Sequence, residues 1–289
     1  MSATISGIQR YFSLIKFSHT IFALPFAMVG FFMAVHFNET QLEWMLLLKV
    51  ILCMVFARSA AMAFNRYLDR DIDAKNKRTA IREIPSGKIS PDSALLFVIA
   101  NSAAFITVTY FINALCFALS PIALTVILGY SFTKRFTALC HFVLGLGLSL
   151  APIGAYLAVT GKFDAMPLLI SFAVLFWVSG FDIIYALQDD EFDRSQELNS
   201  IPVLLGRTSA LTLSRFMHLC AVLFIAAAGF YGDLGVLYWT GTAIFAALLV
   251  YQQSLVRPND LSKVNLAFFT TNGIASVLFA AFVLADFFI

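Results

Sequence analysis

Charged residues are scarce in this chain. Asp, Glu, Lys and Arg make up 12% of its 289 residues, whereas hydrophobic residues make up 60% and the mean hydropathy is +0.86. A soluble domain carries about 25% charged residues, so the composition excludes that class. It indicates an all-α protein that crosses a membrane several times.

Cysteine and histidine are also few and isolated from one another. The four cysteines form no Cys-x-x-Cys pair, which favours buried free thiols over disulfides or a metal site. The four histidines are equally dispersed, so a histidine metal site is not expected. These residues are Cys53, Cys116, Cys140, Cys220, His19, His36, His141 and His218. Residues 1–19 contain Arg10 and Lys16 but no small-residue cleavage pattern, so no cleavable signal peptide is expected.

Long apolar runs recur along the whole chain. A helix needs about 20 apolar residues to cross a bilayer, and nine runs have about that length. They are residues 17–37, 43–66, 92–112, 114–133, 139–160, 166–187, 209–231, 234–255 and 264–288. The sequence therefore predicts a single domain, residues 1–289, in which nine transmembrane helices form a bundle.

Basic residues are concentrated in alternate connections between these runs. The opposite set of connections has Lys162 as its only base. The basic set consists of the N-terminal segment and residues 67–91, 134–138, 188–208 and 256–263. Because basic loops remain in the cytoplasm, we expect a cytoplasmic N-terminus and an external C-terminus in a bacterial inner membrane.

Two acidic clusters at the ends of apolar runs resemble each other. Each contains two Asp four residues apart, preceded at the same distance by another polar side chain. The two sets are Asn65, Asp69 and Asp73, and Tyr185, Asp189 and Asp193. Positions i and i+4 share a helix face, so each cluster is expected to direct a row of oxygens one way. The repeated arrangement suggests an internal duplication that places the clusters face to face beside a central cavity.

Facing rows of oxygens suit magnesium. Mg²⁺ binds about six oxygens and keeps several waters, so it bridges carboxylates to substrate phosphates. Asn65, Asp69 and Asp73 are predicted to hold one ion, and Asp189 and Asp193 another. Such ions neutralise a diphosphate and improve it as a leaving group. The candidate bases for binding the departing diphosphate, on the same predicted side, are Arg78, Arg82, Lys134 and Arg135.

The alternative interpretation is that these acids are helix ends and solvated loop charges. It leaves the matched spacing of the two clusters unexplained. Asp71, Asp190 and Glu191 lie off the shared faces, and for these three residues a solvated role is predicted.

Two further charges fall deeper in the apolar runs. Arg58 lies seven residues before Asn65, and Asp182 lies seven residues before Asp189. Charges inside a membrane are costly and usually face a cavity or each other. Either the two form a structural ion pair, or Arg58 binds a substrate anion while Asp182 accepts a hydrogen bond from the acceptor or from Tyr185.

These motifs resemble those of the UbiA superfamily of intramembrane prenyltransferases. The first cluster matches its NxxxDxxxD motif, and residues 182–193 match DxxYAxxDxxxD. Residues 130–135 resemble YPxxKR, with Ser131 where Pro is common. Residues 78–87 resemble RTxxRPxPxG, with Glu83 in place of a Pro. The likeness covers nearly the whole chain.

The resemblance implies a nine-helix bundle whose central cavity opens to the cytoplasm and sideways to lipid. It also implies Mg²⁺-dependent transfer of a prenyl chain to a ring acceptor. The chain looks most like the branch that prenylates 4-hydroxybenzoate for ubiquinone, and a similar branch acts on 1,4-dihydroxy-6-naphthoate for menaquinone. The departures at Ser131 and Glu83 bear on the loop around the diphosphate, and so on the role of Arg82.

The resulting hypothesis is an aromatic polyprenyltransferase in the lipid bilayer, with a polyprenyl diphosphate and an aromatic acid as substrates and no nucleic-acid partner. The assigned catalytic residues are Asp182, Tyr185 and Arg58. A secondary transporter is the alternative from another class, because internal repeats and intramembrane charges are also transporter traits. An isoprenoid cyclase or a lipid diphosphate phosphatase could use the same diphosphate site without an aromatic acceptor.

Overall fold

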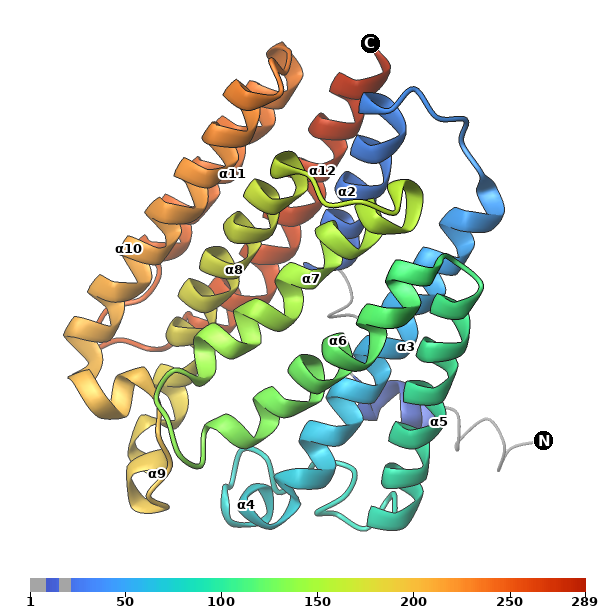
Figure 1. Ribbon diagram of the computed structural model, residues 1–289. Coiled ribbons are helices and arrows are strands. Elements are labelled where there is room, and N and C mark those ends of the chain that lie inside the picture. Colours follow the sequence, from blue (N-terminus) through green and yellow to red (C-terminus); the bar gives the residue numbers. More distant parts are fainter. Residues whose placement is uncertain (1–8, 16–21) are drawn as a thin grey trace.

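Helices lying side by side make up most of the computed structural model, which describes residues 9–15 and 22–289 (Figure 1). The long helices are α2 (Leu24–Phe37), α3 (Trp44–Leu68), α5 (Pro91–Tyr110), α6 (Ala114–Thr133), α7 (Cys140–Thr160), α8 (Ala165–Ala186), α10 (Ile201–Tyr231), α11 (Val236–Ser254) and α12 (Asn272–Phe288). The short ones are α4 (Arg70–Lys75), η2 (Leu187–Asp189), α9 (Asp190–Ser195) and a π-helical turn, η3 (Leu266–Thr271). The predicted all-α class is confirmed for the described residues.

Seven helical segments of the described chain are long and apolar enough to cross a membrane. The helix α2 has 14 residues and is shorter than a span, and α11 is not among the seven. The number of nine crossings therefore stays a prediction. Lys16, His19 and residues 17–21 of the first predicted helix lie outside the described residues.

Polar side chains explain where several helices begin. The Ser90 hydroxyl oxygen accepts a hydrogen bond from the backbone N–H of Ser93 at 3.2 Å, at the start of α5. In the tight connection between α5 and α6, the Asn113 side chain accepts from the Cys116 N–H at 2.8 Å. Its amide also donates to the Leu157 carbonyl of α7 at 2.8 Å. Such caps satisfy N–H groups that have no partner in the first helical turn.

One predicted boundary is wrong. The loop predicted over 188–208 contains α9 and the first turns of α10, which begins at Ile201 rather than near residue 209. The Ser200 hydroxyl oxygen caps this start by accepting from the Val203 N–H at 3.4 Å. Gly206 then interrupts the helix with a φ of 77°, which glycine adopts without strain. The polar residues beside this glycine hide the early start of α10 from a hydropathy pattern.

The helix α8 lies at the centre of the packing, because it contacts both α7 and α10. Its Trp177 is fully buried, with ring contacts to Phe26 and Phe181. The helices α2 and α7 approach closely at Gly30, where a Cβ would lie 2.0 Å from the Pro152 carbonyl oxygen. This packing fixes the backbone of α8, from which Asp182 and Tyr185 extend.

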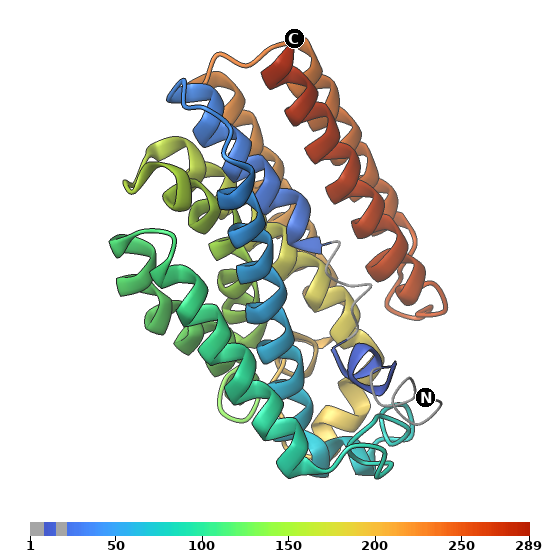
Figure 2. The same cartoon turned by 90° about the vertical axis from the view of Figure 1, so that its right-hand side faces the viewer.

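The two short helices that contain the last Asp of each acidic cluster lie at the same end of the bundle. Figures 1 and 2 show α4 and α9 at this end and the C-terminus at the other. The chain segments that follow α3, α6 and α8 therefore meet there.

Candidate functional site

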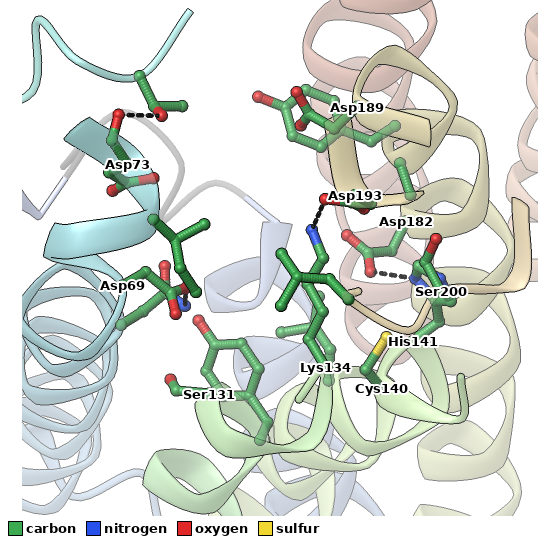
Figure 3. Close-up of a pocket in the computed structure, with 18 of the residues that line it drawn as sticks. Asp69, Asp73, Ser131, Lys134, Cys140, His141, Asp182, Asp189, Asp193 and Ser200 are labelled. Atoms are coloured by element: carbon green, nitrogen blue, oxygen red, sulfur yellow. Dashed lines mark hydrogen bonds and ion pairs between the residues drawn. The ribbon is translucent and has the colours of Figure 1, made fainter. Parts of the chain in front are cut away.

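A cavity of about 290 Å³ brings together every predicted site residue (Figure 3). The predicted residues that line it are Arg58, Asn65, Asp69, Asp73, Arg78, Arg82, Lys134, Arg135, Asp182, Tyr185, Asp189 and Asp193. Figure 3 shows Asp69 and Asp73 on one side and Asp189 and Asp193 on the other, with Lys134 between them. The two acidic clusters thus face one cavity although α5, α6, α7 and most of α8 separate them in sequence.

The clusters do not lie on continuous helix faces, which corrects the prediction. Asp69, with φ −89° and ψ 6°, separates α3 from α4. Asp189, with φ −112° and ψ 6°, is the last residue of η2 and directly precedes α9. Asp73 and Asp193 then occupy the first turns of α4 and α9, where the partial positive charge of a helix N-terminus favours acids. Each pair of carboxylates therefore spans a break between two helices.

Each carboxylate of the two clusters is paired with a different predicted diphosphate-binding base. The pairs are Arg135–Asp69 at 3.0 Å, Arg82–Asp73 at 2.6 Å, Lys134–Asp193 at 2.7 Å and Arg78–Asp189, in which the guanidinium binds both carboxylate oxygens. The acids and bases therefore neutralise each other in this structure. A ligand that carries both cations and phosphate oxygens could take up both sets of partners.

The carboxylates fit magnesium that is held jointly with a substrate. Within residues 9–15 and 22–289, no three His, Cys, Asp or Glu side chains gather closely enough to hold a metal ion. Mg²⁺ typically binds one or two carboxylates, waters and substrate phosphates. The Asp193 carboxylate, 1% exposed, pairs with Lys134 and accepts no hydrogen bond from any other described group. Burial raises the pKa of the Asp69 carboxyl although Arg135 opposes the shift, so a nearby cation would favour its charged form.

Tyr185 and Arg78 link the second cluster to the loop after the first. The Tyr185 hydroxyl accepts a hydrogen bond from Arg78 Nη1 at 3.1 Å. Its ring stacks on that of Phe268 in η3, with centroids 4.1 Å apart. Asn76, which was not predicted, donates from Nδ2 to Asp189 Oδ1 at 3.1 Å. The loop that follows α4 is thereby held against α8 and η2.

Of the two alternatives for the deeper charges, the structural ion pair between Arg58 and Asp182 does not form. Asp182 Oδ2 lies 2.7 Å from His141 Nδ1, and the Tyr185 hydroxyl, its other predicted partner, is bound to Arg78. The helix α7 contacts both α3 and α8, so its His141 supplies the nearer partner. Arg58 has no carboxylate within ion-pair distance in the described chain, and its buried Nε has no hydrogen-bond partner there.

The solvated role predicted for the off-face acids fits Asp71 and Glu191, whose side chains are exposed, but it is wrong for Asp190. The buried Asp190 carboxylate accepts two hydrogen bonds from Arg207, at 2.7 and 2.8 Å. Arg207 follows the kink in α10 at Gly206. The pair therefore ties α9 to α10, a contact between two helices that the spacing of acids alone does not reveal.

The two departures from the family motifs leave the cavity residues together. Glu83 is buried and accepts a hydrogen bond from the Ser13 hydroxyl, while Arg82 beside it binds Asp73. Ser131 lines the cavity, and its carbonyl accepts from Arg135 Nη1 at 3.1 Å.

The cavity wall also contains polar residues that were not predicted as site residues, among them Asn76, Arg66 and His141. Arg66 is buried, and its Nε and Nη1 have no hydrogen-bond partner in the described chain. A signal existed for His141, because an ionisable residue at the start of an apolar run is a candidate for function. An Asn in a polar loop carries no such signal.

A second cavity of about 350 Å³ lies beside the first, among α3, α5, α6 and α7. Its wall is mostly apolar. The residues that line both cavities are Arg58, Met62, Tyr130, Leu144 and Leu148. A polar space that holds charged groups and an apolar space therefore share a wall.

The chain is similar to known proteins along most of its length. A model of the UbiA prenyltransferase family matches residues 23–274. The 4-hydroxybenzoate octaprenyltransferase of Aliivibrio salmonicida is 33% identical over 240 residues, which cover 83% of this chain and 84% of that protein. The apo structure of a UbiA homolog from Aeropyrum pernix K1 is 33% identical, with a TM-score of 0.83, and covers 93% of this chain and 98% of that one. A UbiA homolog from Archaeoglobus fulgidus bound to GPP and Mg²⁺ shares the fold at 21% identity, with a TM-score of 0.72 and coverage of 97% and 100%.

Proposed function

The chain belongs to the UbiA prenyltransferase family, and we propose that it transfers a polyprenyl group from a polyprenyl diphosphate to 4-hydroxybenzoate in respiratory quinone synthesis. The observation that carries this proposal is the pairing of four carboxylates with four bases around one cavity. The similarity to a 4-hydroxybenzoate octaprenyltransferase supports the choice of donor and acceptor. With 1,4-dihydroxy-6-naphthoate as the acceptor, the same chemistry would serve menaquinone synthesis.

The metal ligands of this proposal are the two acidic clusters. Asn65, Asp69 and Asp73 would hold one Mg²⁺, and Asp189 and Asp193 a second. Bound Mg²⁺ would neutralise the diphosphate and make it a better leaving group. A structural neighbour that holds GPP together with Mg²⁺ supports this combination.

The four bases change partners in this proposal. Without substrate, Arg78, Arg82, Lys134 and Arg135 each neutralise a carboxylate. When the diphosphate enters, they bind phosphate oxygens, for which the guanidinium fork of the three arginines is well suited. The diphosphate is thereby held while its bond to the allylic carbon breaks.

The acceptor is recognised deeper in the same cavity. Arg58 binds the carboxylate of the aromatic acid, because it is a guanidinium in the cavity wall without an anionic partner among the described residues. Asp182 accepts a hydrogen bond from the acceptor hydroxyl, and Tyr185, oriented by Arg78, borders the diphosphate. The ring carbon beside the hydroxyl then bonds to the prenyl cation, and a proton leaves the ring.

The second, apolar cavity is suited to the part of the prenyl chain nearest the reacting carbon. It shares Arg58 and Tyr130 with the polar cavity, so a chain lying there keeps its diphosphate end beside the bases. Apolar walls also exclude water, which would otherwise quench the cation. Aromatic faces such as that of Tyr130 can stabilise positive charge on the chain.

The chain is an integral membrane protein. We propose that the cavity and the N-terminus lie on the cytoplasmic side of a bacterial inner membrane, with nine crossings, because the basic connections are those around the cavity. A transporter is less well supported. It needs polar groups near the middle of the bilayer that can be reached from both sides, whereas the acidic clusters lie at one end of the bundle.

The test is a product assay on purified protein in lipid. The protein receives a long polyprenyl diphosphate, Mg²⁺ and either acceptor, and products are identified by mass spectrometry. Asp69→Asn and Asp189→Asn remove carboxylates from the cavity. Asp71→Asn and Glu191→Gln are matched controls, because these acids belong to the same segments but are exposed.

A prenylated ring that disappears with EDTA and with both cavity variants, but persists in both controls, supports the proposal and identifies the acceptor. Release of diphosphate without a prenylated ring rejects these acceptors and favours a cyclase or a phosphatase. Folded protein with no diphosphate chemistry rejects the enzyme and favours the transporter.

A further inference from the structure

His141 is a buried polar residue that sequence reasoning did not assign. It lies in the first turn of α7 and lines the cavity (Figure 3). Its Nδ1 is 2.7 Å from Asp182 Oδ2, and the backbone N–H of Ile201 donates to its Nε2 at 3.2 Å. Both ring nitrogens therefore have protein partners.

The hydrogen bond from Ile201 determines which nitrogen carries the proton. A backbone N–H can only donate, so Nε2 must accept through its lone pair. The ring proton is therefore on Nδ1 and is donated to Asp182 Oδ2. His141 in this state is a neutral donor to Asp182, with no nitrogen left to bind a substrate or to remove its proton.

The contact leaves one oxygen of Asp182 available to the cavity. Oδ2 is held by His141, whereas Oδ1 has no hydrogen-bond partner within the described residues. The Asp182 side chain is 20% exposed and lines the cavity, so the available oxygen is accessible to a ligand. A carboxylate held through one oxygen has a fixed orientation, and the other oxygen becomes a directed acceptor.

His141 is held through its ring, through its backbone carbonyl and through the neighbouring Cys140. Ile201 is the first residue of α10, and its N–H is among the groups for which a helix offers no acceptor. The Ser179 hydroxyl of α8 lies 3.3 Å from the His141 carbonyl oxygen and also contacts the Leu175 carbonyl oxygen of its own helix at 2.7 Å. The neighbouring Cys140 thiol contacts the Asn199 carbonyl at 3.7 Å. His141, in the first turn of α7, thereby links the start of α10 to Asp182 of α8.

We infer that His141 is a positioning residue that orients Asp182 so that its Oδ1 accepts the hydrogen bond of the acceptor hydroxyl. The inference rests on the proposed function. A hydroxyl that donates to a carboxylate makes the aromatic ring more electron-rich, which favours attack on the prenyl cation. Misorientation of Asp182 should therefore slow the transfer step without weakening the binding of the polyprenyl diphosphate.

Two substitutions separate the two hydrogen bonds of the imidazole. The amide of His141→Asn reaches the position of Nδ1 and can still donate to Asp182. The amide oxygen of His141→Gln reaches the position of Nε2 and can still accept from Ile201. The Asn variant therefore keeps the proposed positioning contact, and the Gln variant keeps the contact that caps α10.

We expect kcat to stay within about five-fold of the parent value in the Asn variant and to fall roughly 10- to 100-fold in the Gln variant, because small displacements of a positioned group have effects of this size. The dissociation constant of a polyprenyl thiodiphosphate should not change in either variant. The rate of the Gln variant should also depend more steeply on the acidity of the acceptor hydroxyl across ring-substituted 4-hydroxybenzoates. A purely structural role for His141 would not alter that dependence.

Nitrogen-15 NMR spectra of protein labelled at histidine show which ring nitrogen of His141 carries the proton, and they need no substrate. The spectrum of the His141→Asn variant is subtracted to identify the His141 signals. A signal for a proton on Nε2 overturns the inference. Equal rate losses in the Asn and Gln variants, in step with their thermal stabilities, also overturn it while leaving the proposed function standing. If the parent protein forms no prenylated ring, the proposed function fails and the inference falls with it.

Discussion

Removing one carboxylate from the cavity should change diphosphate binding in opposite directions with and without Mg²⁺. Arg135 is bound to Asp69 at 3.0 Å, so a diphosphate that arrives without metal must compete with this carboxylate for the guanidinium. Asp69→Asn preserves the size of the side chain and removes the competing charge. The variant should therefore bind the diphosphate more tightly than the parent in EDTA, and more weakly in saturating Mg²⁺, because a proposed metal ligand is lost.

The size of the effect follows from the exposure of the pair. Charge-assisted hydrogen bonds contribute roughly 1.5–3 kcal/mol when protected from water. The Arg135 and Asp69 side chains are 32% and 22% exposed, so screening by water reduces the expected contribution of this pair to about 1 kcal/mol. Because about 1.4 kcal/mol corresponds to tenfold, the dissociation constant in EDTA should fall about five-fold. In Mg²⁺ it should rise at least about tenfold, since even outer-shell changes at metal sites have effects of that size.

Isothermal titration of the protein in lipid nanodiscs with a polyprenyl thiodiphosphate, which does not react, measures both constants. Asp71→Asn is the control, because its exposed carboxylate should influence neither constant. The reasoning is wrong if Asp69→Asn binds the analogue no more tightly than the parent in EDTA.

Three further predictions concern the acceptor and the fold. Arg58→Ala should raise the KM for the acceptor roughly 10- to 100-fold, because a charged hydrogen bond is lost, while the affinity for the thiodiphosphate stays constant. An unchanged KM in steady-state assays would contradict the proposal that Arg58 binds the acceptor carboxylate. Gly30→Ala should lower stability by about 1–3 kcal/mol, because its Cβ would meet the Pro152 carbonyl, whereas Gly129→Ala, with open space around it, should be neutral or slightly stabilising. Equal unfolding temperatures for these two variants in detergent would refute the packing argument. Asp190→Asn should lower the free energy of unfolding by about 1 kcal/mol and Glu191→Gln by less than about 0.5 kcal/mol, because Asp190 is buried against Arg207. The same thermal assay compares the two variants, and a larger loss of stability in Glu191→Gln would contradict the prediction.

Helix positions were predicted well where a span of the bilayer sets their length. The run 114–133 coincides with α6, and 139–160 differs from α7 by one residue. The prediction was wrong where local capping rather than hydropathy sets the boundary, as at Ser200 and Gly206 in the first turns of α10. It was also wrong about the continuous helix through each acidic cluster, because spacing alone does not distinguish an unbroken helix from two helices separated by a turn.

The membership of the cavity wall was predictable, but most of its pairings were not. Charges among apolar segments must converge on a polar space, and Arg58 and Asp182 do line the same cavity. Their pairing depends on the path of α7 between helices far apart in sequence, and His141 is the partner that this path supplies. The contact of Arg78 with Asp189 likewise depends on how the loop after α4 folds back over η2.

The pairing of acids with bases also restricts how this site can change during evolution. Loss of Lys134 leaves Asp193, whose side chain is 1% exposed, as an uncompensated buried charge, which is strongly destabilising. Loss of both members together preserves neutrality and removes a proposed metal ligand and a proposed phosphate ligand in one step. Descendants that abandon diphosphate chemistry are therefore expected to lose these residues two at a time, and lineages that keep the chemistry should retain all eight.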